Sequence, residues 1–259
     1  MGEFNNTDHW DGAAERYEKT AHPYTSRYVD AALAHVPLTH ASRVLDVAAG
    51  TGALAFAAAR AGAQVLATDF SPGMVARIAA KAVSNIEARV MDGQALDLPD
   101  EAFDAVFSFF GVFMFPDWRK GLAEMARVTR PAGYGVVAVW QDRGAGAFML
   151  LGQLIRRLFP DRDLAPMPEA MAILSTAEGL ASELVKAGYR DPQIEHVTRD
   201  FDLDMAMLED IDALFGPSPD WTGLDAAQKG LIVSELRRMA GDQPQLPIPS
   251  TALIGMARR

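Results

Sequence analysis

Apolar and polar positions alternate in a regular order between residues 43 and 140. Strand-like apolar runs occur over Arg43 to Gly50, Ala63 to Phe70, Ile86 to Gly93, Ala102 to Gly111 and Gly133 to Trp140. Segments with apolar residues at helical spacing separate them, over Gly52 to Ala61, Pro72 to Ala82 and Asp117 to Thr129. Ser71 before Pro72 is a typical helix start. This order predicts an α/β fold with a mostly parallel sheet and helices on both faces.

The flanking regions follow other patterns. Thr25 to His35 is amphipathic and is expected to pack over one end of the sheet. The later part predicts helices over residues 144–188 with breaks at Pro160, Pro166 and Pro168, a strand over Gln193 to Phe201, helical structure over Met205 to Met239 and a strand over Ser250 to Ala257. The expected sheet therefore has seven strands. We expect an N-terminal helical lid over residues 1–40 and a main domain over residues 41–259, in which residues 141–190 form a helical insertion that covers the substrate.

The composition is that of an acidic chain without cysteine. Among 259 residues, 34 are acidic and 24 are basic, which gives a net charge of -10. Such a surface repels a phosphate backbone, so we expect no nucleic-acid partner. Neither disulfides nor thiolate metal sites can form, and the apolar runs are far shorter than the ~20 residues of a membrane span. The first six residues contain neither a basic residue nor an apolar run, so we expect a cytoplasmic protein without a membrane partner.

The candidate chemistry begins with a small-residue turn at residues 48–52, between the first strand and the first helix. Small side chains let a ligand approach the backbone, and the free N–H groups of a helix start attract an anionic group. Asp69 ends the second strand, where a carboxylate can accept hydrogen bonds from both ribose hydroxyls of a nucleoside. Asp92 and Gly93 end the third strand at the same edge of the sheet. The three positions are expected to converge on one nucleoside.

Four motifs, in this order, carry a resemblance to a known family: VLDVAAGTG, ATDFSPGM, ARVMDGQALDLPDEAFDAVFSFFGVFMFPD and LAEMARVTRPAGYGVVAVW. Over about residues 40 to 140 the chain resembles the class I S-adenosylmethionine-dependent methyltransferases, in the group that includes quinone-ring and small-metabolite methyltransferases. The family usually has glycine where Ala48 stands. The resemblance implies a Rossmann-like fold, S-adenosylmethionine as cofactor and S-adenosylhomocysteine as product.

The resemblance also implies a set of cofactor-binding residues: Tyr17, Tyr24, Arg27, Ala48, Gly50, Thr51, Asp69, Phe70, Met74, Asp92, Gly93 and Phe109. Within this set, Asp69 would bind the ribose and Asp92 the adenine amino group, while Phe70 and Met74 pack on the adenine. Gly50 and Thr51 would lie against the methionine part of the cofactor, and Tyr17, Tyr24 and Arg27 would form a lid with a partner for its carboxylate. Trp10 and Phe113 would contact the substrate.

Several of these residues also have simpler interpretations. Asp69 could cap the next helix, but Ser71 is better placed for that role. Asp92 could be a turn residue, and Arg27 a solvated helix residue. The aromatic run from Phe103 to Trp118 is expected to be mostly core, with pocket candidates only between Phe109 and Phe113. The histidines show no metal-ligand spacing: His9, His22, His35, His40 and His196.

Two other functions remain open at this point. Gly50-x-Gly52-x-x-Ala55 with Asp69 also matches a dinucleotide fingerprint, as in an NAD-dependent oxidoreductase. Against that function, Asp46 lies inside the first strand, and no Tyr-x-x-x-Lys pattern follows. The second alternative is a noncatalytic S-adenosylmethionine-binding protein.

The reaction that we favour is methyl transfer by in-line displacement, in which an N, O or C atom of a small-molecule acceptor attacks the sulfonium methyl group. Orientation alone can supply much of the rate, so the sequence names no catalytic base. His9, Tyr17 and Asp142 are the first residues to test if the acceptor must lose a proton. We expect residues 8–28 to order over the cofactor as a lid, and a monomer or a homodimer.

Overall fold

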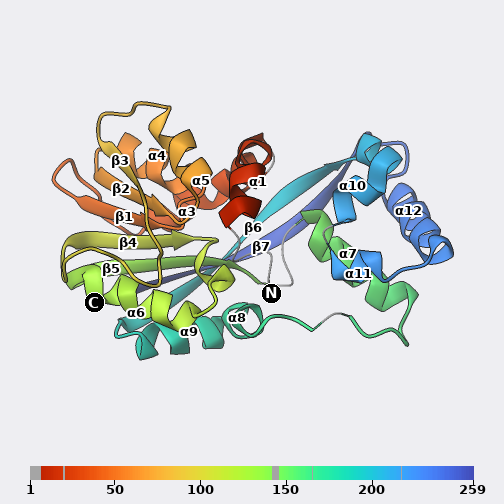
Figure 1. Ribbon diagram of the computed structural model, residues 1–259. Helices are drawn as coiled ribbons and strands as arrows, with labels where there is room; N and C mark the ends of the chain where they lie inside the picture. Colours follow the sequence, from red (N-terminus) through yellow and green to blue (C-terminus); the bar gives the residue numbers. More distant parts are fainter. Residues whose placement is uncertain (1–6, 20, 142–145, 165, 217) are drawn as a thin grey trace. The chain divides into compact units, whose positions relative to one another are not determined.

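The computed structural model describes residues 7–19, 21–141, 146–164, 166–216 and 218–259 (Figure 1). Two compact units make up the chain. The first contains the residues up to Val139 together with Ala172–Val197 and Ala252–Arg259, and the second contains Trp140–Met171 and Thr198–Thr251. The expected insertion over residues 141–190 is thus shared between the units, because residues 172–190 belong to the first.

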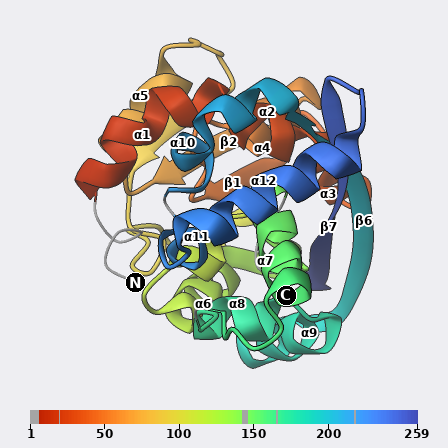
Figure 2. The same ribbon diagram turned by 90° about the vertical axis from the view of Figure 1, so that its right-hand side faces the viewer.

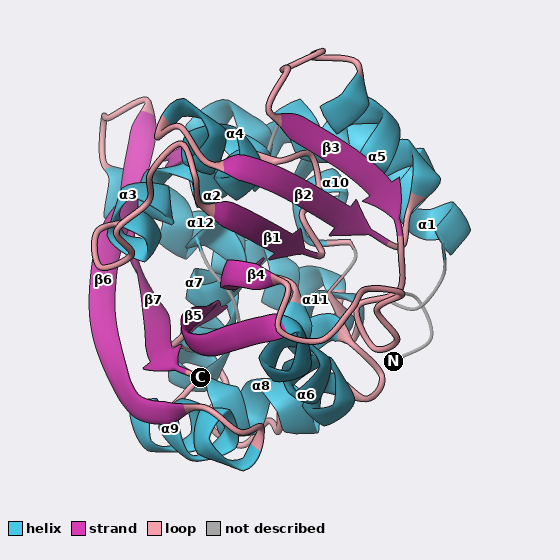
Figure 3. Cartoon of the chain, turned by 90° about the vertical axis from the view of Figure 1, so that its left-hand side faces the viewer, coloured by secondary structure: helices cyan, strands magenta, loops and turns pink. Residues whose placement is uncertain are grey.

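The chain forms a seven-stranded sheet, as the sequence predicted. Its strands are β1 (Arg43–Val47), β2 (Gln64–Asp69), β3 (Ile86–Val90), β4 (Phe103–Phe109), β5 (Thr129–Trp140), β6 (Arg190–Asp204) and β7 (Gln245–Arg258). The first unit contains β1 to β4, nearly all of β5 and parts of β6 and β7. Their order in the sheet is β3-β2-β1-β4-β5-β7-β6, and the pairs among β1 to β5 are parallel. The arrowheads of β1, β2 and β3 point to the same edge (Figure 3). Strand order reverses at β1, the kind of switch point beside which α/β sheets bind ligands.

Helices cover both faces of this sheet, with α4 and α5 on one side and α6 and α9 on the other (Figure 1). Their bounds are α4 (Ala53–Arg60), α5 (Pro72–Ala79), α6 (Trp118–Val128) and α9 (Ala177–Lys186). The predicted start of α5 is confirmed, because the Ser71 hydroxyl accepts a hydrogen bond from the Met74 N–H at 3.2 Å and Pro72 takes the first helical position. Asp117 caps α6 in the same way, through the N–H of Lys120.

A chain of short helices precedes the sheet. It consists of α1 (Thr7–Lys19), α2 (Ala21–Thr25), a 3-10 turn η1 (Ser26–Tyr28) and α3 (Val29–Leu33). The amphipathic segment from Thr25 is therefore a 3-10 turn followed by one short helix. Tyr28 is fully buried, and Val29 and Ala32 are also in the core.

The second unit has a separate hydrophobic core. It contains α7 (Gly146–Leu158), the first half of α8 (Glu169–Leu174), a 3-10 helix η3 (Met205–Asp210), α10 (Ile211–Phe215), α11 (Pro219–Thr222) and α12 (Ala226–Ala240). Figure 2 shows α12 beside α7. Phe215, Trp221, Ile232 and Leu236 are fully buried in this core.

The helical character expected over Met205 to Met239 is confirmed, but it is divided among η3, α10, α11 and α12. Gly216 and Gly223 each follow a short helix, and Pro219 begins the next at its first helical position. A new start follows at Asp225, which forms a capping box with Gln228 at the beginning of α12. Apolar spacing continued across these breaks because each short helix buries residues in the same core.

Candidate active site

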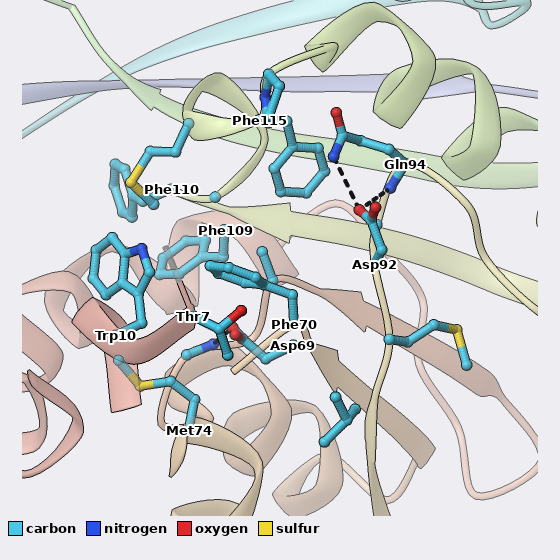
Figure 4. A pocket seen from close by; sticks show the side chains of 18 of the residues that line it. Thr7, Trp10, Asp69, Phe70, Met74, Asp92, Gln94, Phe109, Phe110 and Phe115 are labelled. Carbon is cyan, nitrogen blue, oxygen red and sulfur yellow. Dashed lines mark hydrogen bonds between the residues drawn. The ribbon is translucent and has the colours of Figure 1, made fainter. Parts of the chain in front are cut away.

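A pocket of about 430 Å³ lies in the first unit at the carboxyl ends of β1 to β4. The turns after these four strands, together with α1 and α5, supply its walls (Figure 4). The lining residues are Thr7, Trp10, Tyr17, Ala48, Gly50, Asp69, Phe70, Met74, Val90, Met91, Asp92, Gly93, Gln94, Phe109, Phe110, Gly111, Met114, Phe115 and Pro116. A cavity of this size is within the range of sites for cofactors and small ligands.

The turn after β1 has an unusual backbone. Ala48, Gly50 and Gly52 have φ angles of 56°, 55° and 90°. Glycine adopts this left-handed region freely, whereas alanine does so at a steric cost of roughly 1 kcal/mol. Ala48 therefore has the backbone of a glycine, in agreement with the glycine that the family has at this position. The turn leads directly into α4, so its N–H groups lie at a helix start.

Asp69 links this turn to the start of α5. One carboxyl oxygen accepts a hydrogen bond from the Gly50 N–H at 2.9 Å, and the other accepts one from the Ser71 N–H at 3.0 Å. The residue is only 5% exposed but still lines the pocket. The pKa of Asp69 is raised, because the effect of burial exceeds that of the hydrogen bonds from Ser71 and Gly50, which lower it. Each oxygen has a second lone pair, so Asp69 can accept further hydrogen bonds from a ligand.

The turn after β3 provides a second carboxylate. Asp92 is exposed, and one of its oxygens accepts hydrogen bonds from the backbone N–H of Gln94 at 2.9 Å and from its side-chain amide at 3.0 Å (Figure 4). Gly93 is required by close packing, because a Cβ there would lie 2.6 Å from the Phe115 ring and 2.7 Å from Val47. Phe115 and the loop after β3 therefore meet at the edge of the sheet.

Aromatic rings gather at one end of the pocket. Figure 4 shows Trp10, Phe109 and Phe110 together, on the side away from Asp92 and Gln94. The rings of Phe109 and Phe110 are 4.7 Å apart in an edge contact. Phe110 has a φ of 62°, which is rare for a bulky residue, and its ring also packs at 5.7 Å on that of Tyr28. This end of the pocket is apolar and rigid.

Helix α1 closes part of the pocket. The Tyr17 ring lies against Gly50, where a Cβ would be 3.3 Å from it. Burial and the nearby carboxyls of Asp69 and Asp46 raise the pKa of Tyr17 to about 12. Its hydroxyl therefore remains protonated at neutral pH and is unsuited to act as a base.

Polar contacts along one side of α1 attach it to α5. The Asp11 carboxylate accepts hydrogen bonds from the Ser71 hydroxyl and, at 2.8 Å, from the Gly73 N–H at the start of α5. Further along, Glu18 pairs with Arg77 at 3.0 Å and with Lys81 at 2.8 Å. A negative charge at a helix start and these ion pairs favour docking of α1.

Comparisons with known proteins agree with this geometry. A family model described as a methyltransferase domain matches residues 44–133. A demethylmenaquinone methyltransferase of Corynebacterium efficiens is 36% identical over 166 residues, 60% of this chain and 71% of that protein. One from Thermus thermophilus is 37% identical over 179 residues, 60% of this chain and 80% of that protein.

The chain belongs to the class I S-adenosylmethionine-dependent methyltransferases. Among solved structures, the YcgJ protein of Bacillus subtilis matches with a TM-score of 0.60 at 18% identity, over 90% of this chain and 98% of that one, which shows a shared fold. The methyltransferase therefore uses S-adenosylmethionine, and nothing favours the oxidoreductase or the noncatalytic alternative.

Most of the residues expected to bind cofactor or substrate in the methyltransferase lie on the pocket. The structure brings together Trp10, Tyr17, Ala48, Gly50, Asp69, Phe70, Met74, Asp92, Gly93 and Phe109. Four others do not line it. Thr51 is buried, and its hydroxyl is 2.7 Å from Nδ1 of His22, while the Tyr24 hydroxyl is 3.0 Å from that of Tyr28. Arg27 is exposed, and Phe113 is half-buried beside the pocket wall.

Sequence reasoning missed several pocket residues. The range Phe109 to Phe113 included Phe110 and Gly111 but ended before Met114, Phe115 and Pro116, for which nearness to the end of β4 was the available signal. Thr7, Val90, Met91 and Gln94 also line the pocket. Of the candidate bases, His9 is half-buried with its ring 5.5 Å from that of Trp10, and Asp142 lies outside the described residues.

The methyltransferase also holds an unexpected buried acid. Asp46 in β1 is fully buried, and neither of its carboxyl oxygens has a hydrogen-bond partner among the described residues.

Within the same described residues, no group of three or more His, Asp or Glu side chains could hold a metal ion. No helix in that part of the chain has the length and apolar character needed to cross a bilayer.

Proposed function

We propose that this methyltransferase acts on an uncharged, ring-shaped acceptor of the quinol type, which binds against the aromatic end of the pocket. The proposal rests on the residue types that form the pocket walls. Among the described residues that line the pocket, none is Lys, Arg or His, and the rings of Trp10, Phe109 and Phe110 face one end. An anionic acceptor would find no counter-charge there, whereas a planar apolar ring can stack.

The names of the relatives support the same class of acceptor. Two curated relatives are demethylmenaquinone methyltransferases, and each shares over a third of its aligned residues with this chain. An acceptor related to demethylmenaquinone would present a flat, uncharged ring system to the aromatic wall.

We propose that the polar end of the pocket holds the cofactor. The residues suit it, because the turn at Gly50 lines the pocket at the start of α4, and Asp69 can accept further hydrogen bonds at 5% exposure. Asp69 would bind the ribose hydroxyls, and the exposed carboxylate of Asp92 would take the adenine amino group. Phe70 and Met74 would pack on the adenine ring. When bound, S-adenosylmethionine supplies an electrophilic methyl group on a sulfonium.

The contribution of the protein is then orientation and exclusion of water. The aromatic wall fixes the plane of the acceptor, and α1 with Trp10 and Tyr17 shields the site. Because Tyr17 keeps its proton at neutral pH, it can donate a hydrogen bond but cannot remove a proton from the acceptor. The proposal therefore includes no base from α1 at this position.

We also propose that residues 8–28 form a lid and that residues 141–190 help to cover the acceptor. The placement of Thr7, Trp10 and Tyr17 on the pocket wall supports the first role. The helices α7, α8 and α9 within residues 141–190 agree with the helical character expected for the second.

A methyl-transfer assay with matched acceptors tests the proposed function. The protein would be incubated with S-adenosylmethionine and either a short-chain demethylmenaquinol analogue or a naphthoic acid of similar size. We expect mass spectrometry to find a methylated product from the quinol alone. Equal methylation of the carboxylate, or none of the quinol with turnover of a charged acceptor, would contradict the proposed acceptor class.

A further inference from the structure

The turns that follow β1 and β4 meet at a single point beside the pocket. A Cβ built on Gly111 would lie 2.5 Å from the Cβ of Ala48 and 3.3 Å from the Ala48 carbonyl oxygen. Such a carbon–carbon distance is far inside van der Waals contact, so position 111 must lack a side chain while position 48 carries a methyl group. Both residues line the pocket.

The backbone on both sides of this contact has an uncommon conformation. Ala48 has a φ of 56° and Phe110 a φ of 62°, so both turns hold a non-glycine residue in the left-handed region. Such conformations persist only where surrounding packing over-determines them, and they cluster at functional sites. Gly111 itself has a φ of -109°, which alanine can adopt without strain. The Ala48 methyl group is therefore the tightest obstacle to a side chain at position 111, ahead of the Ser108 hydroxyl at 3.2 Å and the Ala48 carbonyl oxygen at 3.3 Å.

We propose that Ala48 and Gly111 form a steric pair in which the methyl group of Ala48 sets the position of the Phe109–Phe110 wall relative to the cofactor turn. The inference rests on the proposed function, since it assigns the wall to the acceptor. Ala48 is then a positioning residue for methyl transfer. Its methyl group fills space that the glycine usual in the family would leave open, and it holds the Phe110 ring at the aromatic end.

Moving the methyl group from one turn to the other tests the pair. Gly111→Ala adds a second methyl in occupied space and is expected to weaken S-adenosylhomocysteine binding about tenfold, as overpacking displaces the turns. The double variant Ala48→Gly with Gly111→Ala places one methyl group in nearly the same space. It is expected to restore the affinity to within about threefold of the wild type.

Calorimetric titration with S-adenosylhomocysteine measures these affinities, and thermal unfolding reports the fold of each variant. Gly255→Ala is the matched control, because a Cβ there would meet Leu180 at 2.9 Å and Gly255 does not line the pocket. The control should lower the melting temperature without changing the affinity, and Ala48→Gly should not rescue it.

The effect of the steric pair on acceptor binding is measured by steady-state kinetics with the demethylmenaquinol analogue. Ala48→Gly alone should raise the KM for the analogue about fivefold while S-adenosylhomocysteine affinity stays within about threefold, because the wall loses its contact but the cofactor turn relaxes. An unchanged KM would overturn the positioning role. If the analogue is not methylated at all, the acceptor proposal fails, while the titrations still decide the steric pair.

Two results would overturn the steric pair. The first is wild-type affinity in the Gly111→Ala variant, and the second is a double variant as weak as Gly111→Ala. If Gly111→Ala does not yield folded protein, recovery of folded, ligand-binding protein in the double variant supports the pair, and failure to recover overturns it.

Discussion

At the scale of single residues, the buried carboxyl of Asp46 links the stability of the protein to pH. Burial raises the pKa of Asp46 to about 8, and the nearby charge of Asp69 acts in the same direction. The native state therefore binds this proton more tightly than the unfolded chain, whose ordinary aspartate pKa is 3.8. The contribution to the free energy of unfolding is largest below the ordinary pKa and is lost as the pH rises through about 8.

Asp46→Asn removes this titration with little change of shape. We expect the variant to gain stability relative to the wild type as the pH increases from 5 towards 8, by about 2–4 kcal/mol in the free energy of unfolding. Urea unfolding at several pH values measures the gain. Asp97→Asn, an exposed acid in the loop after β3, should show no such trend. A constant difference between Asp46→Asn and the wild type at all pH values would be inconsistent with a raised pKa.

Site residues could be predicted from the sequence where a local motif marked them. Asp69 was found because it ends a strand beside a glycine-rich turn, and the structure places it on the pocket. Ala48 was found from the family pattern, although its positive φ could not be read from the residue itself. The pairing of Ala48 with Gly111 escaped prediction because the two residues are brought together only by strand order.

At the scale of elements, α1 is docked partly through solvent-accessible ion pairs. Its contacts with α5 and with the turn after α5 include ion pairs of Glu18 that are partly exposed, with 37% of the Arg77 side chain and 53% of the Lys81 side chain accessible to solvent. Pairs of this kind each contribute about 0.2–1 kcal/mol and weaken with salt. Docking of α1 should therefore depend on ionic strength.

Hydrogen exchange measures this docking directly. In the free protein, we expect faster exchange over residues 7–19 at high salt than at low salt, and protection there when S-adenosylhomocysteine binds. Glu18→Gln should accelerate exchange at low salt and reduce the salt effect, because it removes the pairs with Arg77 and Lys81. Glu87→Gln, which breaks an exposed pair with Arg89, is the control. Identical exchange with and without ligand would argue for a static arm.

The start of α5 was predicted closely, while the divisions within residues 205–239 were not, although α12 there begins with a capping box. The start of α5 is fixed by Ser71 and Pro72, both visible in the sequence. Residues 205–239 kept helical spacing through several turns, so periodicity alone could not show where each helix ends. The glycines at 216 and 223 were the signal that should have divided the segment.

At the scale of the whole molecule, the sheet follows from its parallel βαβ units, and the division into two units does not. Helices join β1 to β2, β2 to β3 and β4 to β5, and these connections constrain the strand order strongly, which is why a parallel sheet with helices on both faces could be predicted. The second unit is assembled from residues 140–171 and 198–251, which are separated in the sequence. The association of these two segments depends on packing between apolar helix faces that are far apart in the sequence. No local sequence pattern shows which of these faces contact each other.

We propose that the edge of this sheet binds the cofactor through Asp69. Titration calorimetry with S-adenosylhomocysteine tests it most directly, with wild-type protein, Asp69→Ala and the exposed control Asp97→Ala. Loss of two hydrogen bonds to a carboxylate, each contributing about 1.5–3 kcal/mol, should weaken binding by at least about a hundredfold in Asp69→Ala. The wild type and the control should bind one equivalent with equal affinity. Absence of binding to the wild type, or an affinity of folded Asp69→Ala within about twofold of it, would contradict the account.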